Sequence, residues 1–157
     1  MPIVRTERMI ICMLSDEEME KKIEEEADIG MKKAYSEMLC GCRENPEQRI
    51  WYAIWVMKLN DGTNRVVGDL SFKGINKNGV IEIGYGINPK YEGQGFMTEA
   101  VIAMVNWASN QSGVTCVEAE AEANNYASKR VLEKAGFVPN GVIGDEGPRF
   151  VWKQHTQ

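Results

Sequence analysis

Two closely spaced glycines, Gly93 and Gly95, lie between an apolar segment that stops at Pro89 and another that begins near Phe96. The order strand, Gly-x-Gly, helix directs backbone amides and the positive end of a helix at phosphate oxygens. The glycines let the backbone approach such a ligand closely. No Gly-Lys-Ser/Thr follows, and the third glycine of a dinucleotide fingerprint is missing. The loop therefore indicates either another kind of phosphate site or a plain tight turn.

Glu82 is the first candidate for acid–base chemistry. Strand alternation places it on one face with Val80, Gly84 and Gly86, and the apolar and aromatic residues between them on the other. The two glycines leave open space above their face of the strand. A carboxylate beside such a space is a candidate general base, acting directly or through water. A solvated glutamate on a half-exposed strand is the alternative.

Three further glutamates, Glu118, Glu120 and Glu122, alternate with apolar residues on a later segment. On a strand they form an acidic ladder along one face. If this ladder lines the same cleft as Glu82, it would attract a cationic amine and offer an alternative base. A solvent-facing polar side is the other interpretation.

The four cysteines and the single histidine, His155, do not match the ligand spacing of a zinc site. We therefore expect no metal and reduced thiols. Cys40 and Cys42, near the end of a predicted helix, are the one pair whose reactivity is worth testing.

The elements that must position these residues follow from periodicity and from local signals. Ser15 and Glu18 form a capping box, Asn60-Asp61-Gly62 predicts a hairpin turn, and Asn125 caps a helix. The two strands that flank the glycine loop and its helix should be parallel, because a helical crossover joins them. We expect strands at 3–12, 51–57, 66–72, 80–87, 114–122, 137–143 and 149–153, and helices at about 16–29, 31–42, 95–113 and 126–135.

Length and charge limit the number of domains and the kinds of partner that we expect. A chain of 157 residues with 43% hydrophobic residues suits one domain, residues 1–157. The net charge of -5 opposes nucleic acid and anionic membrane as partners. No apolar run is long enough to span a membrane, and the first residues lack a secretory signal, so we expect a cytoplasmic protein.

Three segments carry a family resemblance. The stretch from Glu82 to Ala100 resembles the central motif of the GNAT superfamily of N-acetyltransferases. Asn125 to Phe137 resembles its second motif, in the form found in the RimJ/RimL-like branch that acetylates ribosomal-protein N-termini, and 6–11 is similar to the opening of that branch. The resemblance spans nearly the whole chain. It implies a mixed α+β, three-layer fold, with a central six- to seven-stranded, mostly antiparallel sheet, one parallel strand pair and about four flanking helices.

The resemblance also implies a site for acetyl-CoA as co-substrate. It assigns the glycine loop to the pyrophosphate, the strand before the loop to the pantetheine arm, and Asn125 to a position near that arm. Glu92 and Met97 depart from the usual residues, and a carboxylate at 92 beside a diphosphate should weaken binding at low salt. The residues implied are Tyr85, Gly86, Ile87, Gly93, Gln94, Gly95, Phe96, Met97, Thr98 and Asn125.

For catalysis, the resemblance favours Glu82 as base. The tyrosine that many relatives use to protonate the departing thiolate is replaced by Leu132. In the RimL-like branch the serine of Asn-x-x-Ser is proposed for that role, which carries over to Ser128. A first-turn serine that satisfies a local amide is the competing interpretation. Lys129 and Arg130 follow Ser128, and exposed helix charges of this kind are usually only solvated.

We therefore expect an enzyme that moves the acetyl group of acetyl-CoA to a primary amine by direct attack in a ternary complex. The acceptor is a protein N-terminus or a small amine, Trp51 or Trp55 is a candidate wall of its pocket, and the protein is a monomer or a homodimer. The alternative is a catalytically inactive acyl-CoA-binding sensor or regulatory module. Glu92, Met97 and Leu132 support that alternative.

Overall fold

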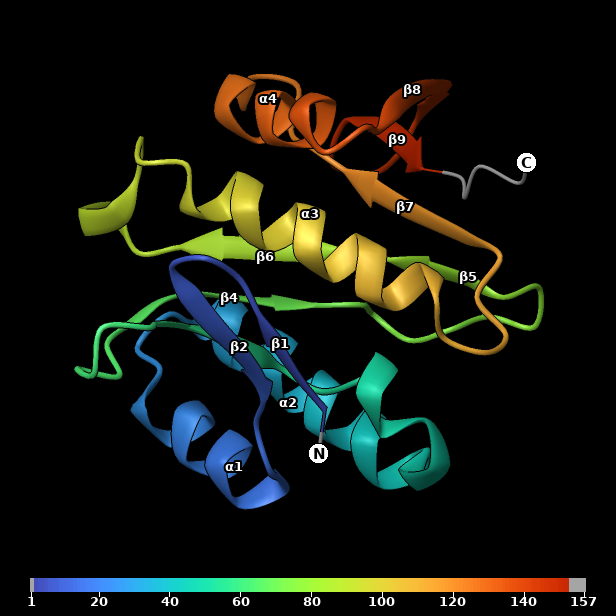
Figure 1. The fold of residues 1–157 in the computed structure, drawn as a ribbon. Coiled ribbons are helices and arrows are strands. Elements are labelled where there is room, and N and C mark those ends of the chain that lie inside the picture. Colours follow the sequence, from blue (N-terminus) through green and yellow to red (C-terminus); the bar gives the residue numbers. More distant parts are fainter. Residues whose placement is uncertain (1, 153–157) are drawn as a thin grey trace.

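The computed structural model describes residues 2–152. Lys153, the predicted end of the last strand, and His155 lie outside them. Within the described residues the strands form two sheets that lie against four α-helices (Figure 1). This arrangement confirms the predicted mixed α+β class with its single parallel strand pair.

The first sheet has five antiparallel strands and the second has four. The first runs in the order β1 (Ile3–Arg5), β2 (Met9–Met13), β3 (Trp55–Leu59), β4 (Val66–Ser71) and β6 (Gly84–Ile87). The second runs in the order β5 (Val80–Glu82), β7 (Cys116–Glu120), β9 (Pro148–Trp152) and β8 (Val138–Ile143). Among the described strands only β5 and β7 pair in parallel, because a helical crossover joins them.

Four α-helices and two short 3-10 helices complete the described residues. Helix α3 crosses in front of the strands and α2 lies behind them (Figure 1). Both predicted caps are present, since Ser15 and Glu18 form a capping box and Asn125 accepts from the backbone N–H of Ser128. The helices are α1 (Asp16–Glu25), α2 (Ile29–Glu44), α3 (Phe96–Ser109) and α4 (Tyr126–Lys134), and the 3-10 helices span Pro46–Trp51 and Pro89–Tyr91.

Two of the predicted strands are divided, which raises the strand number above the expected six or seven. The segment 3–12 is a hairpin, because the backbone N–H of Thr6 turns back to the C=O of Met9. The segment 80–87 is divided at Ile83 into β5 and β6. A third segment, 51–57, starts later than expected, because Trp51 ends a 3-10 helix that begins at a proline.

The division at Ile83 creates the central opening of the fold. The N–H of Ile83 donates to the C=O of Glu118 at 2.8 Å, and this bond is the last between this segment and β7. From Gly84 onward the chain pairs only with β4, while β7 continues beside β9. The two sheets therefore part at Ile83, and β6 becomes the free edge of its own sheet.

Aromatic side chains fill the core under α3. Trp51, Trp55 and Phe72 are buried and pack with Trp107 in edge-on or tilted contacts, with ring centroids 5.0 to 6.4 Å apart. Such contacts add to the stability from buried area. Trp51 and Trp55 are thus core residues, and neither lines the two pockets described below. Their neighbour Tyr52 lines a pocket instead.

Candidate active site

A cleft of about 780 Å³ lies where β6 parts from the second sheet, and we call it the wedge. Its walls are the edge of β6, the glycine loop with the start of α3, and the first turns of α4, which lie near one another in Figure 1. Of the ten residues that the sequence predicted for a cofactor, all except Gln94 line it. The wedge is lined by Tyr85, Gly86, Ile87, Tyr91, Glu92, Gly93, Gly95, Phe96, Met97, Thr98, Asn125, Ala127, Ser128, Arg130, Val131 and Lys134.

The glycine loop reaches the wedge through backbone conformations that favour glycine. Gly93 and Gly95 have φ values of 74° and 80°, in the left-handed region. Gly95 is the N-cap of α3, and no side chain occupies its capping position. The first amides of this helix are therefore left for another acceptor, and the positive end of the helix dipole favours an anion there.

Thr6, Arg8 and Glu99 fasten this loop to the N-terminal hairpin. The carboxylate of Glu99 accepts from the hydroxyl of Thr6 at 2.5 Å and from Nε of Arg8 at 2.7 Å. Arg8 also donates to the C=O of Gln94 at 2.9 Å and stacks 4.0 Å from the centroid of the Phe96 ring. These hydrogen bonds outweigh burial and hold the pKa of Glu99 below its usual value. The residues shared with the opening of the family pattern thus position the start of α3.

Basic side chains from α4 stand along the wedge. Arg130 and Lys134 both line it, four residues apart on one face of the helix. Sequence reasoning placed no weight on Arg130 and missed Lys134, although their spacing was a usable signal. Lys129 points elsewhere, because its Nζ donates to the C=O of Ala123 at 2.6 Å. Glu92, exposed at the mouth of the wedge, is the one acidic lining residue.

Two hydroxyls meet inside the wedge. Oη of Tyr85 lies 2.9 Å from Oγ of Ser128 and 3.2 Å from its backbone C=O, while the backbone N–H of Ser128 donates to Asn125 at 3.0 Å. The serine hydroxyl therefore pairs with a tyrosine, not with a local amide. Leu132 is fully buried and has no polar atom to offer. Burial raises the pKa of Tyr85, against a smaller opposing effect of the Ser128 hydrogen bond, so the phenol keeps its proton at neutral pH.

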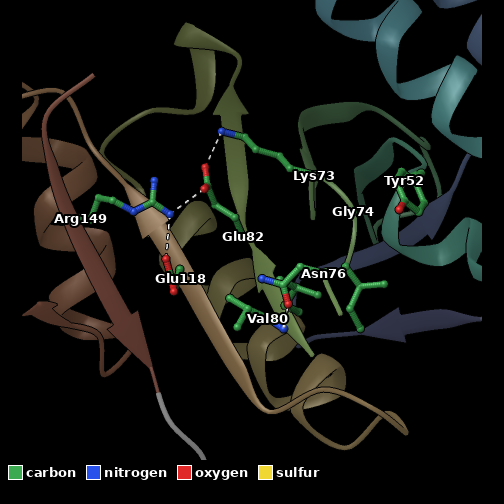
Figure 2. A pocket seen from close by; sticks show the side chains of 10 residues that line it. Tyr52, Lys73, Gly74, Asn76, Val80, Glu82, Glu118 and Arg149 are labelled. Atoms are coloured by element: carbon green, nitrogen blue, oxygen red, sulfur yellow. Dashed lines mark hydrogen bonds and ion pairs between the residues drawn. The ribbon is translucent and has the colours of Figure 1, made fainter. Parts of the chain in front are cut away.

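On the other face of the segment 80–87, Glu82 is held by two cations (Figure 2). Its carboxylate accepts from Nζ of Lys73 at 2.8 Å and from Arg149 at 2.7 Å. Burial raises the pKa of Glu82, but these two hydrogen bonds and charges outweigh it and leave the pKa below the ordinary value of 4.5. Glu82 is therefore a carboxylate across the neutral range.

Arg149 joins two glutamates of the acidic ladder to Glu82 through hydrogen bonds. It donates to Glu118 at 2.9 Å and to Glu120 at 2.9 Å as well as to Glu82. Figure 2 shows Arg149 between Glu82 and Glu118. Three carboxylates thus face two cations, and we call Lys73, Glu82, Glu118, Glu120 and Arg149 the ion-pair cluster. Glu122 is exposed and lies beyond the end of β7.

A pocket of about 320 Å³ extends from the ion-pair cluster along β5. Its walls combine the charged groups with Tyr52, Ile75 and Val80, and Figure 2 shows Tyr52 on the far side of the pocket from Arg149. An amine with an apolar attachment fits such walls, because the ammonium and the apolar part each find matching surface. The full lining is Tyr52, Lys73, Gly74, Ile75, Asn76, Val80, Ile81, Glu82, Glu118 and Arg149.

Asp69 supplies another carboxylate on this face. It lies opposite Gly86 in the β4–β6 register, and a Cβ on Gly86 would be 3.9 Å from its Oδ1. The hydroxyl of Tyr35 donates to Asp69 at 2.8 Å, and Lys22 lies 3.4 Å away. Burial and the Asp69 charge raise the pKa of Tyr35. Helices α1 and α2 thus contact β4 through polar interactions with Asp69, which no sequence motif predicted.

Cys40 and Cys42 show no sign of enhanced reactivity. Cys40 is exposed and Cys42 is buried, and the pKa of each is raised, by a hydrogen bond to Glu44 and by burial respectively. A raised pKa lowers the thiolate fraction. Residues 2–152 contain no group of three or more His, Cys, Asp and Glu side chains that is placed to hold a metal ion. No helix among these residues is long and apolar enough to cross a membrane.

Comparison with known proteins identifies the family. Residues 3–138 match the family described as Acetyltransferase (GNAT) domain, and the chain belongs to this family of N-acetyltransferases. It is 34% identical over 87 residues to the uncharacterized N-acetyltransferase YjdG of Bacillus subtilis. That match covers 55% of this chain and 51% of YjdG, so the chain matches about half the length of this relative.

Solved structures share this fold over nearly their whole length. RimL, a ribosomal L7/L12 alpha-N-protein acetyltransferase in complex with coenzyme A, superposes with a TM-score of 0.75 at 16% identity, covering 97% of this chain and 98% of that chain. A GNAT-family acetyltransferase from Bacillus anthracis gives 0.69 at 21% identity, covering the same shares, 97% and 98%. These likenesses concern the fold.

Proposed function

We propose that this protein transfers the acetyl group of acetyl-CoA to a primary amine by direct attack in a ternary complex. The wedge carries this proposal. It joins an open strand edge, an uncapped helix start and two hydroxyls in one cleft, with a carboxylate on the opposite face of the same strand segment.

Successive parts of the wedge suit the diphosphate, the pantetheine arm and the thioester of acetyl-CoA. The amides of the glycine loop and the side chains of Arg130 and Lys134 offer donors for a diphosphate. The free edge of β6 offers N–H and C=O groups to the amides of the pantetheine arm, much as a neighbouring strand would. The bound substrate supplies an activated acetyl thioester. The thioester end then lies toward Gly84, where the two sheets part.

Glu82 is proposed to bind the acceptor as an ammonium, which loses one proton to solvent before attack, and to take up the second proton of the nitrogen as the new bond forms. A carboxylate with a lowered pKa is a weak base toward a free ammonium ion. Attack nevertheless makes the nitrogen far more acidic, so a nearby carboxylate becomes a competent proton acceptor. Activity should therefore increase with pH as the acceptor amine deprotonates, and not through a titration of Glu82 near neutrality.

Ser128 and Tyr85 are proposed to protonate the departing thiolate. Their hydroxyls lie 2.9 Å apart, so a proton given up by one can be replaced from the other. This pair fills the role that Leu132 cannot. Sequence reasoning assigned Tyr85 only a backbone contact and did not anticipate the use of its hydroxyl.

The acceptor is proposed to be a protein N-terminus or a small amine. The pocket beside Glu82 accommodates an ammonium with an apolar neighbour, and both kinds of acceptor provide one. RimL, a ribosomal L7/L12 alpha-N-protein acetyltransferase of the same fold, supports the first kind. A panel of short peptides and small amines would rank the two.

The test is thiol release. Wild-type protein mixed with acetyl-CoA and amines should liberate CoA, whereas tight binding without release would favour the sensor alternative. Glu82→Gln should lower turnover and leave the acetyl-CoA Kd unchanged. Ser128→Ala and Tyr85→Phe should each lower the single-turnover rate, and Ser128→Cys should lower it less than Ser128→Ala. Wild-type rates in Ser128→Ala and Tyr85→Phe would remove the hydroxyl pair from the mechanism.

A further inference from the structure

Lys73 has an unusual backbone for its residue type. Its φ is 52°, in the left-handed region that a lysine rarely enters, and only Asn64 shares this feature among the non-glycine residues described. Neighbouring hydrogen bonds enforce the conformation: the C=O of Phe72 accepts from Glu82, and the N–H of Gly74 donates to Trp51. Such strain persists only where the surroundings impose it, and it concentrates at functional positions.

The side chain of Lys73 occupies the space that the glycine at position 84 leaves. A Cβ on Gly84 would lie 2.9 Å from Cε of Lys73 and 3.5 Å from its Nζ, so any larger residue there would displace the lysine. The sequence predicted open space above this glycine, and the structure fills it with an amine. Nζ ends 2.8 Å from Glu82, with 46% of the side chain still exposed (Figure 2).

The position of this amine coincides with the place where an acceptor must arrive. Gly84 is the first residue beyond the last bond to β7, and it directly precedes Tyr85, which lines the wedge. The proposed base, Glu82, already contacts Nζ. Lys73 therefore presents a primary amine, tethered to the chain, beside the carboxylate and over Gly84, toward which the thioester is proposed to point.

We propose that Lys73 is itself an acetyl acceptor, so that the protein acetylates its own Lys73 when acetyl-CoA is bound and no other amine competes. This inference rests on the proposed function. Nζ loses one proton to solvent, and the neutral amine attacks the thioester carbon; a C–N bond forms, Glu82 takes the second proton from this nitrogen, and the C–S bond breaks. The CoA thiolate takes a proton from the Ser128 and Tyr85 hydroxyl pair or from water. The products are N-acetyl-Lys73 and free CoA.

Mass spectrometry tests this proposal. Purified protein is incubated with acetyl-CoA alone, and the acetylated positions are located by peptide mapping over time. We expect one acetyl group at Lys73, added at a first-order rate that does not depend on protein concentration. Lys73→Arg should abolish it, and Glu82→Gln should slow it at least tenfold. The matched control Lys77→Arg, an exposed lysine of the same loop, should leave it unchanged.

A second acetyl donor separates delivery by the site from ordinary lysine reactivity. Acetic anhydride needs no binding site, so it should modify Lys77 at least as readily as Lys73. Equal modification of Lys73 and Lys77 by acetyl-CoA, or a rate that increases with protein concentration, would overturn the proposal. If the protein releases CoA to added amines while Lys73 stays unmodified, this inference fails and the proposed function stands. If acetyl-CoA does not bind, both fail.

Discussion

The wedge and the ion-pair cluster lie on opposite faces of the segment 80–87, and they are built in different ways. The wedge depends on backbone: a free strand edge, two glycines with positive φ and a helix start. The cluster depends on side chains, brought from three separate stretches of sequence to meet around Arg149 and Glu82. A backbone site tolerates many side-chain changes. A site of mutually paired charges tolerates few, because each removal leaves a partner without compensation.

The largest effect is expected from Arg149→Met. Three half-buried or buried carboxylates would lose their common partner, and removing one member of a buried ion pair costs about 3 to 5 kcal/mol. Because 21% of the Arg149 side chain is exposed, we expect Arg149→Met to lower the free energy of unfolding, measured with urea, by about 2 to 3 kcal/mol. Arg43→Met removes an exposed partner of Glu20 and should cost less than about 0.5 kcal/mol. Equal losses in the two variants would contradict the contrast between the cluster and an ordinary surface pair.

Gly95→Val tests whether the backbone conformation of the glycine loop controls binding in the wedge. A β-branched residue at a φ of 80° costs about 1 to 3 kcal/mol and shifts the start of α3. We expect the acetyl-CoA Kd, measured by titration calorimetry, to rise by about tenfold or more. Gly62→Val has a similar φ, 86°, in the distant β3–β4 turn. It should lower stability to a similar degree without changing the Kd, and a raised Kd there would mean that the effect is not local.

Low pH should decrease the free energy of unfolding through Glu82, in the ion-pair cluster, and Glu99, which fastens the glycine loop of the wedge. Both carboxyl groups have pKa values below their ordinary 4.5. The unfolded chain then binds more protons than the folded one as the pH decreases toward that value. Their contribution to the free energy of unfolding is complete above about pH 4.5 and is lost as the pH falls through the lower folded-state pKa values. Unfolding measured from pH 6 to 3 should show this decrease, with a shallower slope for Glu82→Gln and for Glu99→Gln. An unchanged slope in both variants would show that other carboxylates govern acid unfolding.

The smallest effect is expected from Glu92→Arg. The substitution replaces a carboxylate at the mouth of the wedge by a cation, which should lower the acetyl-CoA Kd a few-fold at low salt and less at high salt. Glu24→Arg makes the same charge change on α1 and should leave the Kd unaltered. An unchanged or higher Kd for Glu92→Arg would argue against placing the diphosphate at this mouth.

The same contrast explains what the sequence could predict. The glycine loop, the cap at Asn125 and the parallel pair are local or topological signals, and the family resemblance that includes them implied the fold class and nine of the sixteen residues that line the wedge. Lys73, Arg149 and Asp69 have no such signal, because their roles depend on pairing across the sheet. The contact between Tyr85 and Ser128 was missed for the same reason, and Glu82 was expected beside empty space that Lys73 fills.

The hydrogen bond from Ile83 to Glu118, at the point where the two sheets part, has a consequence for amide exchange. Ile83 is 1% exposed, and its N–H joins the two sheets at the point where they part. Its proton should therefore exchange with solvent only through global unfolding, while the amides of Gly93 and Gly95 exchange through local motion. Ligand binding in the wedge would then slow exchange at the loop much more than at Ile83, and the two sites together would separate ligand contact from a general gain in stability.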